Sequence, residues 1–210
     1  MLIRPLPGNC HILIVTVMFV AIALKPLCLS GQNAAPSNLL ETGQVALAGR
    51  TISYRIRNLP VNAFPDLPVP IADALTARGC LIPQTYQARR PENVIHASFE
   101  RPGSDDWAVL CSAQGQISLL VFFASGSPAE PAVLARQPAT QRLQPHDLTG
   151  VLGFNWGIDP ASPKQVHEAQ AGMSHRPVPP DHDCVADSQI DQRTVFHLFR
   201  NGEWEMVDTQ

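Results

Sequence analysis

The sequence has few charged residues and no excess of basic ones. Only 16% of its 210 residues are charged, against about 25% in ordinary soluble domains. Arg4 and Lys25 are the only charged residues of the first 30. The rest of the chain therefore contains 13 of the 15 basic residues and all 18 acidic ones. A mildly acidic domain without a basic stripe is a poor partner for nucleic acid and for anionic membranes. We therefore expect no nucleic-acid partner, and no membrane partner once a leader is removed.

Signatures of catalysis are also lacking. The sequence contains no Gly-x-Gly-x-x-Gly, no phosphate-binding loop, no Gly-x-Ser-x-Gly and no Cys-x-x-Cys or His-Glu-x-x-His. Asp105 and Asp106 are adjacent, and neighbours in a strand point to opposite faces, so they are not expected to share a proton. The sequence predicts no catalytic residue, no cofactor and no metal, and it favours a protein that is not an enzyme.

The N-terminus has the pattern of a secretory signal peptide. Arg4 precedes an apolar run over residues 12–24, and small residues follow near Ser30. The run is shorter than the about 20 apolar residues that cross a membrane comfortably. We predict a signal peptide over residues 1–30, cleaved near Ser30, and export to the periplasm or the outside. An uncleaved leader that anchors the protein is the alternative.

Three cysteines remain after the leader, namely Cys80, Cys111 and Cys184. Cys80 follows an expected helix end and Cys111 closes an expected strand, so both lie against the core. We predict that they form a disulfide, which would stabilise the fold by about 3 kcal/mol in the chain-entropy model. Two buried free thiols are the alternative, since cysteine is a common core residue. Cys184 is left without a partner.

The 20 prolines predict short elements joined by many loops. Residues 31–48 are expected to form a flexible tether, and residues 49–210 a single globular domain. Residues 125–145, rich in Pro, Ala and Gln, are expected to hold at most a turn of helix. Alternation of apolar and polar residues, turn signals and helical spacing predict strands over 51–57, 93–99, 106–111, 117–123, 194–199 and 204–207, and helices over 71–78 and 162–173. The sum is an α+β domain, with a mainly antiparallel sheet of four to six strands and two short helices packed on it.

The densest group of possible metal ligands lies near the C-terminus. Asp181, His182, Asp183 and Cys184 are contiguous, and Asp187 follows. Imidazole, carboxylate and thiolate all bind metals, but contiguous residues reach one ion only from a tight loop. A solvated loop is the simpler interpretation. A metal-binding protein or metal-dependent hydrolase that uses His182, Asp183 and Asp187 is the alternative function.

One family resemblance joins several segments. The string Arg78-Gly-Cys-Leu-Ile-Pro-Gln84, then Asn93-Val-Ile95, then Asp106-Trp-Ala-Val-Leu-Cys111, resembles a family of uncharacterised exported proteins of the acidobacterial type. The resemblance extends over residues 50–208. It implies export and a recurring Cys80–Cys111 pair, and it implies no activity, because the family has none assigned.

These observations favour a non-catalytic exported protein that binds an unknown protein or small ligand in the cell envelope. An inhibitor of an envelope hydrolase is a specific form of this hypothesis, since such inhibitors are small and need a rigid loop more than a catalytic set. A structural protein held in the envelope by an uncleaved leader is a third interpretation.

Overall fold

The computed structural model describes residues 39–173, 176 and 178–208. The predicted signal peptide over residues 1–30 lies outside the described residues. The described residues all belong to one compact unit. Within the described ranges no helix is long and apolar enough to cross a membrane.

The larger of two sheets contains nine strands. Seven follow one path in the order β7-β6-β5-β3-β2-β9-β8, while β1 pairs with β2 and β4 pairs with β5. All pairings are antiparallel except β2 with β9, where Tyr54 lies opposite Leu152. The bounds are β1 Leu39–Leu47, β2 Arg50–Pro60, β3 Leu81–Gln84, β4 Val94–Ala97, β5 Asp106–Ala113, β6 Gln116–Phe122, β7 Ala132–Pro138, β8 Leu143–Pro145 and β9 Leu152–Phe154.

The smaller sheet is a regular antiparallel meander in the order β10-β11-β12-β13. Its last hairpin turns at Asn201 and Gly202, whose φ values of 54° and 86° are those of the turn type that matches strand twist. The bounds are β10 Trp156–Ala161, β11 Cys184–Gln189, β12 Arg193–Arg200 and β13 Glu203–Asp208.

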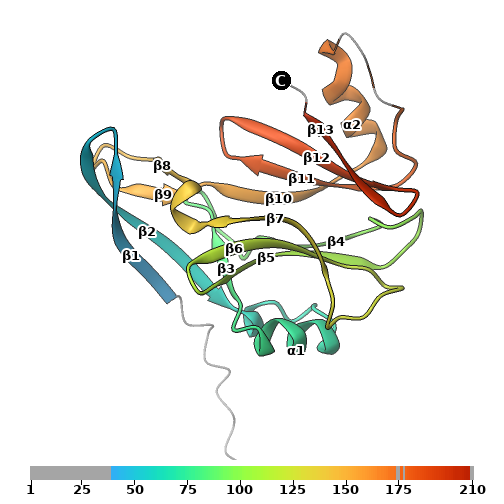
Figure 1. Ribbon diagram of the computed structural model, residues 1–210, viewed down its shortest axis with the longest axis horizontal. Helices are drawn as coiled ribbons and strands as arrows, with labels where there is room; N and C mark the ends of the chain where they lie inside the picture. Colours follow the sequence, from blue (N-terminus) through green and yellow to red (C-terminus); the bar gives the residue numbers. More distant parts are fainter. Residues whose placement is uncertain (1–38, 174–175, 177, 209–210) are drawn as a thin grey trace, which may run out of the picture. The chain divides into compact units, whose positions relative to one another are not determined.

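The elements stack in four layers, α1, large sheet, small sheet and α2 (Figure 1). Helix α1 (Val69–Ala77) covers one face of the large sheet through Ile71 and Leu75. The opposite face meets the small sheet in a core that includes Trp156 and Val185. Helix α2 (Pro163–Ala169), which begins at a Ser162–Gln165 capping box, buries Val166 against the outer face of the small sheet. Each sheet therefore has two covered faces over much of its area.

The fold class expected from the sequence is wrong. The chain is mostly β, with a mixed nine-stranded sheet and a second sheet of four strands among the described residues, instead of one sheet of four to six strands carrying both helices. Proline explains much of the error, because a proline in a run argues against a strand. Five of the strands contain one, at Pro60, Pro83, Pro138, Pro145 and Pro160.

Two ranges expected to lack regular structure contain strands. Residues 39–47, within the range expected as a flexible tether, form β1, which pairs with β2 along its whole length. Residues 125–145 contain β7, β8 and a 3₁₀ turn. In contrast, the predicted meander is confirmed as β4-β5-β6, and the predicted helices and C-terminal hairpin are present as α1, α2 and β12-β13.

The predicted disulfide is present. Cys80 and Cys111 are bonded, with their Cα atoms 5.0 Å apart, and both lie in the core beneath α1. The bridge links Cys80, three residues after the end of α1, to strand β5. Since disulfides persist in oxidising compartments, this bond is compatible with an exported protein.

Candidate functional site

The three residues of the metal hypothesis do not meet at one point. The His182 Nδ1 atom lies 2.6 Å from the Asp181 carboxylate, and Asp183 accepts a hydrogen bond from the Ser98 N–H at 3.2 Å. Asp187 lies further along β11. Over the described ranges, no group of three or more His, Cys, Asp and Glu side chains is placed to hold a metal ion.

Asp187 instead forms a buried charged cluster with Arg142 and His197. One carboxylate oxygen lies 3.4 Å from an Arg142 guanidinium nitrogen and the other lies 3.3 Å from His197 Nε2. The Asp187 and His197 side chains are 8% and 5% exposed. Alternation along β11 places Asp187 on the same face as Val185, which faces the large sheet. The cluster thus lies between the two sheets.

Arg142 is held from several sides. Its guanidinium carbon lies 4.3 Å from the centre of the Trp156 ring, a cation–π geometry. The Gln137 side-chain amide is oriented with its oxygen toward the guanidinium. In this orientation the oxygen accepts a hydrogen bond from Arg142 at 3.0 Å. Burial lowers the pKa of Arg142, Asp187 acts in the opposite direction and Arg193 adds to the lowering. An arginine remains charged under such a shift, so Arg142 is a fixed positive charge whose side chain is 17% exposed.

A polar hollow of about 310 Å³ opens beside this cluster. Residues from β7 and the turn after it line one side, and residues from β11 and β12 line the other. Arg193 contacts Asp208 at the rim. The lining residues are Gln137, Gln141, Arg142, Asp187, Gln189, Arg193 and Val195.

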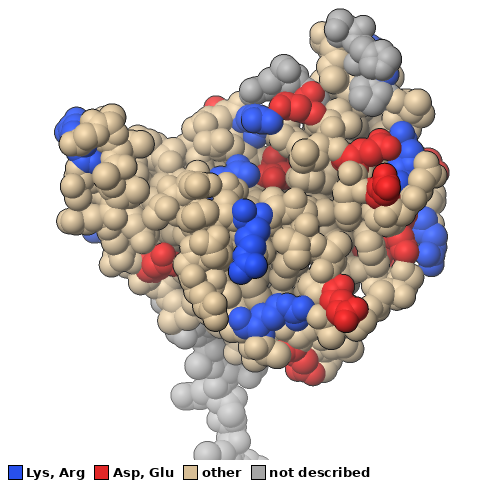
Figure 2. Space-filling model, viewed as in Figure 1, with Lys and Arg blue, Asp and Glu red and all other residues tan. Residues whose placement is uncertain are grey.

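A second hollow, of about 270 Å³, lies on the α1 side of β7. It is lined by Arg78 and Arg136 together with core residues such as Leu120. Figure 2 shows the consequence on one face of the molecule, where basic side chains follow one another from the small sheet down toward α1. We call the arginines that line the two hollows, Arg142 and Arg193 of the first and Arg78 and Arg136 of the second, the arginine row.

The four arginines of the row differ in how their charge is balanced. Arg142 and Arg193 are paired with Asp187 and Asp208. Arg78 donates only to the backbone oxygens of Ala74 and Ala129. Among the described residues, neither Arg78 nor Arg136 has a carboxylate within 4.0 Å. The α1 side of the row therefore presents uncompensated positive charge.

Strand β7 lies at the centre of this face. It ends the large sheet, and within the described ranges it pairs with β6 alone. Val133 is 57% exposed. An edge strand of this kind presents unpaired N–H and C=O groups that can receive another strand. The candidate site is therefore the free edge of β7 and the arginine row beside it.

Most of this site escaped sequence reasoning. From the sequence, Asp187 is recognised only as a possible metal ligand, and His197 lies within the strand predicted over residues 194–199. Arg142 and Gln137 lie in a Pro-, Ala- and Gln-rich stretch, which has no motif. The sequence signal for strand β7 is weak, because apolar and polar residues alternate over only part of the Ala132–Gln137 segment.

Cys184, the cysteine left without a partner, is a core residue. It is fully buried beside α2. Burial raises its pKa to about 12, with Asp183 adding to the shift and Arg200 opposing it. The reactive form of a cysteine is the thiolate, so this thiol is unreactive as a nucleophile in the folded protein.

Cys184 should therefore resist alkylation until the protein unfolds. At pH 8 a thiol with this pKa is about a thousandfold poorer in thiolate than one with the ordinary value of 9.0. In a chain that lacks residues 1–30, and with them Cys10 and Cys28, we expect one iodoacetamide adduct per chain in urea, with the disulfide intact, and none over the same time without urea. Intact mass measures both. Equal labelling rates in the two conditions would show that the thiol is accessible.

The chain matches no protein-family model, no curated protein and no solved structure. The resemblance to exported proteins of the acidobacterial type stays a prediction.

Proposed function

We propose that this chain is a non-catalytic interaction protein of an exported compartment, which binds an extended acidic segment of a partner protein along β7. The observation that carries the proposal is the free edge of β7 between two pairs of arginines. Addition of a strand to a sheet edge is a common way of binding peptides: main-chain hydrogen bonds supply affinity and flanking side chains supply selectivity.

The charge of the edge favours an acidic partner over a second copy of the chain. Two copies paired through β7 would bring their Arg136 side chains near each other, and like charges on neighbouring strands are destabilising. Arg136 and Pro138 are also residues of the kind that protect an edge from unselective pairing. A segment with Glu or Asp on alternate residues would instead face Arg136 and Arg78.

The partner remains to be identified, and an inhibitor fits this scheme. If the acidic segment belongs to an envelope hydrolase, its capture by β7 would block that enzyme without any catalytic group in the chain. The Cys80–Cys111 bond supports the exported setting, because disulfides persist in oxidising compartments. It also anchors β5, two strands from the edge.

The test uses a proline substitution that should leave the sheet intact. N–H groups along an edge strand point alternately to the neighbouring strand and to solvent. The Ala139 N–H is donated inward to the Gly115 carbonyl oxygen at 3.3 Å. By alternation the N–H groups of residues 137 and 135 also point inward, so the N–H of Arg136, which lies between them, points outward to solvent. Arg136→Gln therefore removes one charge, whereas Arg136→Pro removes the same charge and also the outward donor.

The probe is a fluorescent seven-residue peptide of alternating Val and Glu, and the comparison peptide carries Lys in place of Glu. We expect the Glu peptide to bind in an anisotropy titration and the Lys peptide not to bind. Arg136→Gln should weaken binding about fivefold and Arg136→Pro should abolish it, with unchanged melting temperatures. Arg101→Gln, at an exposed turn, is the matched control.

Two results would overturn the proposal. One is binding of the Glu peptide by Arg136→Pro as tightly as by the unaltered protein. The other is a concentration-dependent dimer that Arg136→Pro dissociates, which would assign the β7 edge to a second copy of the chain.

A further inference from the structure

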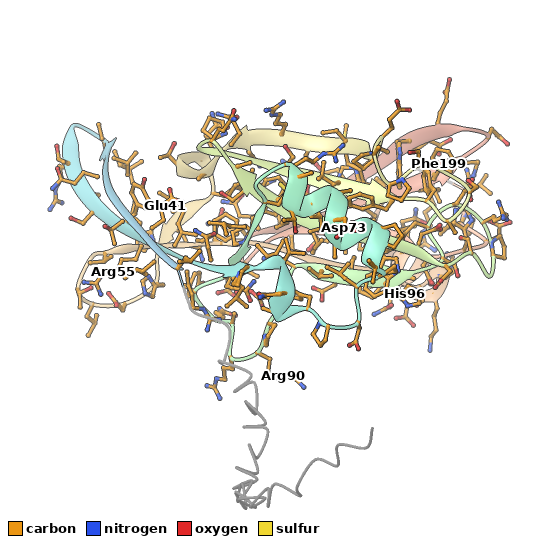
Figure 3. The ribbon with its side chains drawn as sticks, turned by 90° about the horizontal axis from the view of Figure 1, so that it is seen from below. Glu41, Arg55, Asp73, Arg90, His96 and Phe199 are labelled. Atoms are coloured by element: carbon orange, nitrogen blue, oxygen red, sulfur yellow. A yellow bond between two sulfur atoms is a disulfide. The ribbon has the colours of Figure 1, made fainter. Side chains whose placement is uncertain are left out.

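A third hollow, of about 470 Å³, lies on the α1 side of the large sheet, away from β7. Its floor is the sheet itself. Ile82 of β3 belongs to the core beneath α1, so Gln84, two residues later, lies on the same face. Arg57 is opposite Gln84 in the ladder and Arg55 follows the same alternation. Figure 3 looks at this face and shows Arg55 beside the β1-β2 hairpin, well away from Asp73 on α1.

The basic groups of this hollow outnumber its acidic ones. Arg55 and Arg57 both line it, and the only lining carboxylate is that of Asp147. In the described part of the chain, neither arginine has an acidic partner within 4.0 Å. The Asp147 carboxylate accepts the Thr149 N–H at 2.8 Å and the Thr149 hydroxyl at 2.5 Å. These hydrogen bonds lower the pKa of Asp147, and the nearby His146 and Arg55 lower it further. Two guanidinium groups against one carboxylate leave the hollow with a net positive charge.

One wall of the hollow is rigid and aromatic. The Tyr86 and His146 rings have centroids 5.1 Å apart. The Tyr86 hydroxyl donates to Asp191 at 3.0 Å and accepts from Gln144 at 2.6 Å. A Cβ at Gly153 would lie 2.7 Å from the Tyr86 Cβ and 2.9 Å from the His146 Nδ1, so glycine is required for the two side chains to pack this closely. The wall is thus held in place before any ligand arrives.

The other surfaces are partly apolar. Leu40 and Val151 line the hollow together with the small residue Ala88. Leu40 is opposite Arg57 in the β1-β2 ladder, so an apolar group and a guanidinium lie side by side. The Arg57 guanidinium is itself oriented by the Ala88 carbonyl oxygen at 3.0 Å. Ligand pockets of this size commonly combine an apolar lining with a few fixed polar groups.

We infer that this hollow is a binding site for a small organic anion, whose carboxylate or phosphate pairs with Arg55 and Arg57 and whose apolar body lies against Leu40, Val151 and the Tyr86 ring. Arginine suits this role because its planar donors match both kinds of anionic group. The site is independent of the β7 edge, so either proposal can fail without the other.

Three probes separate the contributions of charge and apolar body. Hexanoate carries both, hexanamide carries only the body, and inorganic phosphate carries only the charge. We expect hexanoate to shift the Gly153 and Arg55 amide signals saturably in an NMR titration of the purified chain, with a dissociation constant in about the millimolar range for so small a ligand. Hexanamide and inorganic phosphate should bind at least about fivefold more weakly.

Arg55→Gln is the variant of choice. Arg55 is exposed and lies on the surface of β2, so its loss should leave the fold intact, and the affinity for hexanoate should fall about tenfold. Arg50→Gln, five residues earlier in the same strand, is the matched control and should change the affinity less than twofold. Equal binding of hexanamide and hexanoate, unchanged affinity in Arg55→Gln, or no binding of hexanoate would overturn the inference. Phosphate binding as tight as that of hexanoate would replace it with a phosphate site.

Discussion

Replacing Asp106 by alanine should lower the free energy of unfolding by about 3–5 kcal/mol, because one buried and two partly buried backbone N–H groups lose their acceptor at once. Asp106 begins β5 and is fully buried. One carboxylate oxygen accepts from Phe99 and Glu100 at 2.9 and 2.7 Å, and the other accepts from Ala124 at 2.8 Å. The side chain therefore ties the ends of β4, β5 and β6 together.

The preceding residue supplies the control. Asp105 is exposed, with its contact to His96 at the surface, and exposed ion pairs contribute at most about 1 kcal/mol. Urea unfolding of Asp105→Ala and Asp106→Ala, each followed by tryptophan fluorescence, measures the contrast. Similar midpoints for the two variants would show that Asp106 is not the acceptor on which this corner depends.

Arg142→Ala should cost about 3–5 kcal/mol, because it strands the Asp187 carboxylate between the two sheets with only His197 beside it. The cation–π contact with Trp156 is lost in the same step. The variant also removes two donors from the Gln137 amide oxygen. Most of the expected loss of stability comes from the Asp187 charge that is left without its partner. This contribution can be separated from the loss of packing over Trp156.

The separation uses the double variant Arg142→Met with Asp187→Leu. Replacing a buried ion pair by apolar residues of similar volume is often neutral or stabilising, so the double variant should be more stable than Arg142→Ala. Arg193→Ala, which breaks the more exposed Arg193–Asp208 pair, should cost under about 1 kcal/mol. Chemical denaturation of the three proteins gives the comparison. A double variant as unstable as Arg142→Ala would assign the loss to packing over Trp156 instead of to charge.

Local patterns in the sequence predicted local structure well. Asn201-Gly202 marks the last hairpin, Gly79 follows α1, and Cys80 and Cys111 are bonded. The hairpin and the helix end depend on residues that are near one another in the chain. The disulfide depends on two cysteines that each adjoin or belong to an element of the core. Such signals are read from turn chemistry and side-chain alternation alone.

The completion of the large sheet and the candidate site could not be predicted in the same way. Strand β9 has three residues, too few for alternation to be recognised, and its parallel pairing with β2 has no signal in either segment. Arg142 and Asp187 are 45 positions apart, on elements that meet only after both sheets form. The β7 edge is also a property of strand order, which follows from packing of the whole chain.

The pairing of β2 with β9 has a consequence for how the chain folds. Tyr54 and Leu152 meet across almost a hundred residues, so the large sheet is completed late, after a long loop has closed. Chains dominated by such distant contacts fold in about milliseconds to seconds, far more slowly than helical bundles. Until β9 arrives, the side of β2 that it occupies in the final sheet stays open to other strands. We therefore expect a stage of folding in which this side of β2 is open to strand addition, as the edge of β7 is in the final sheet.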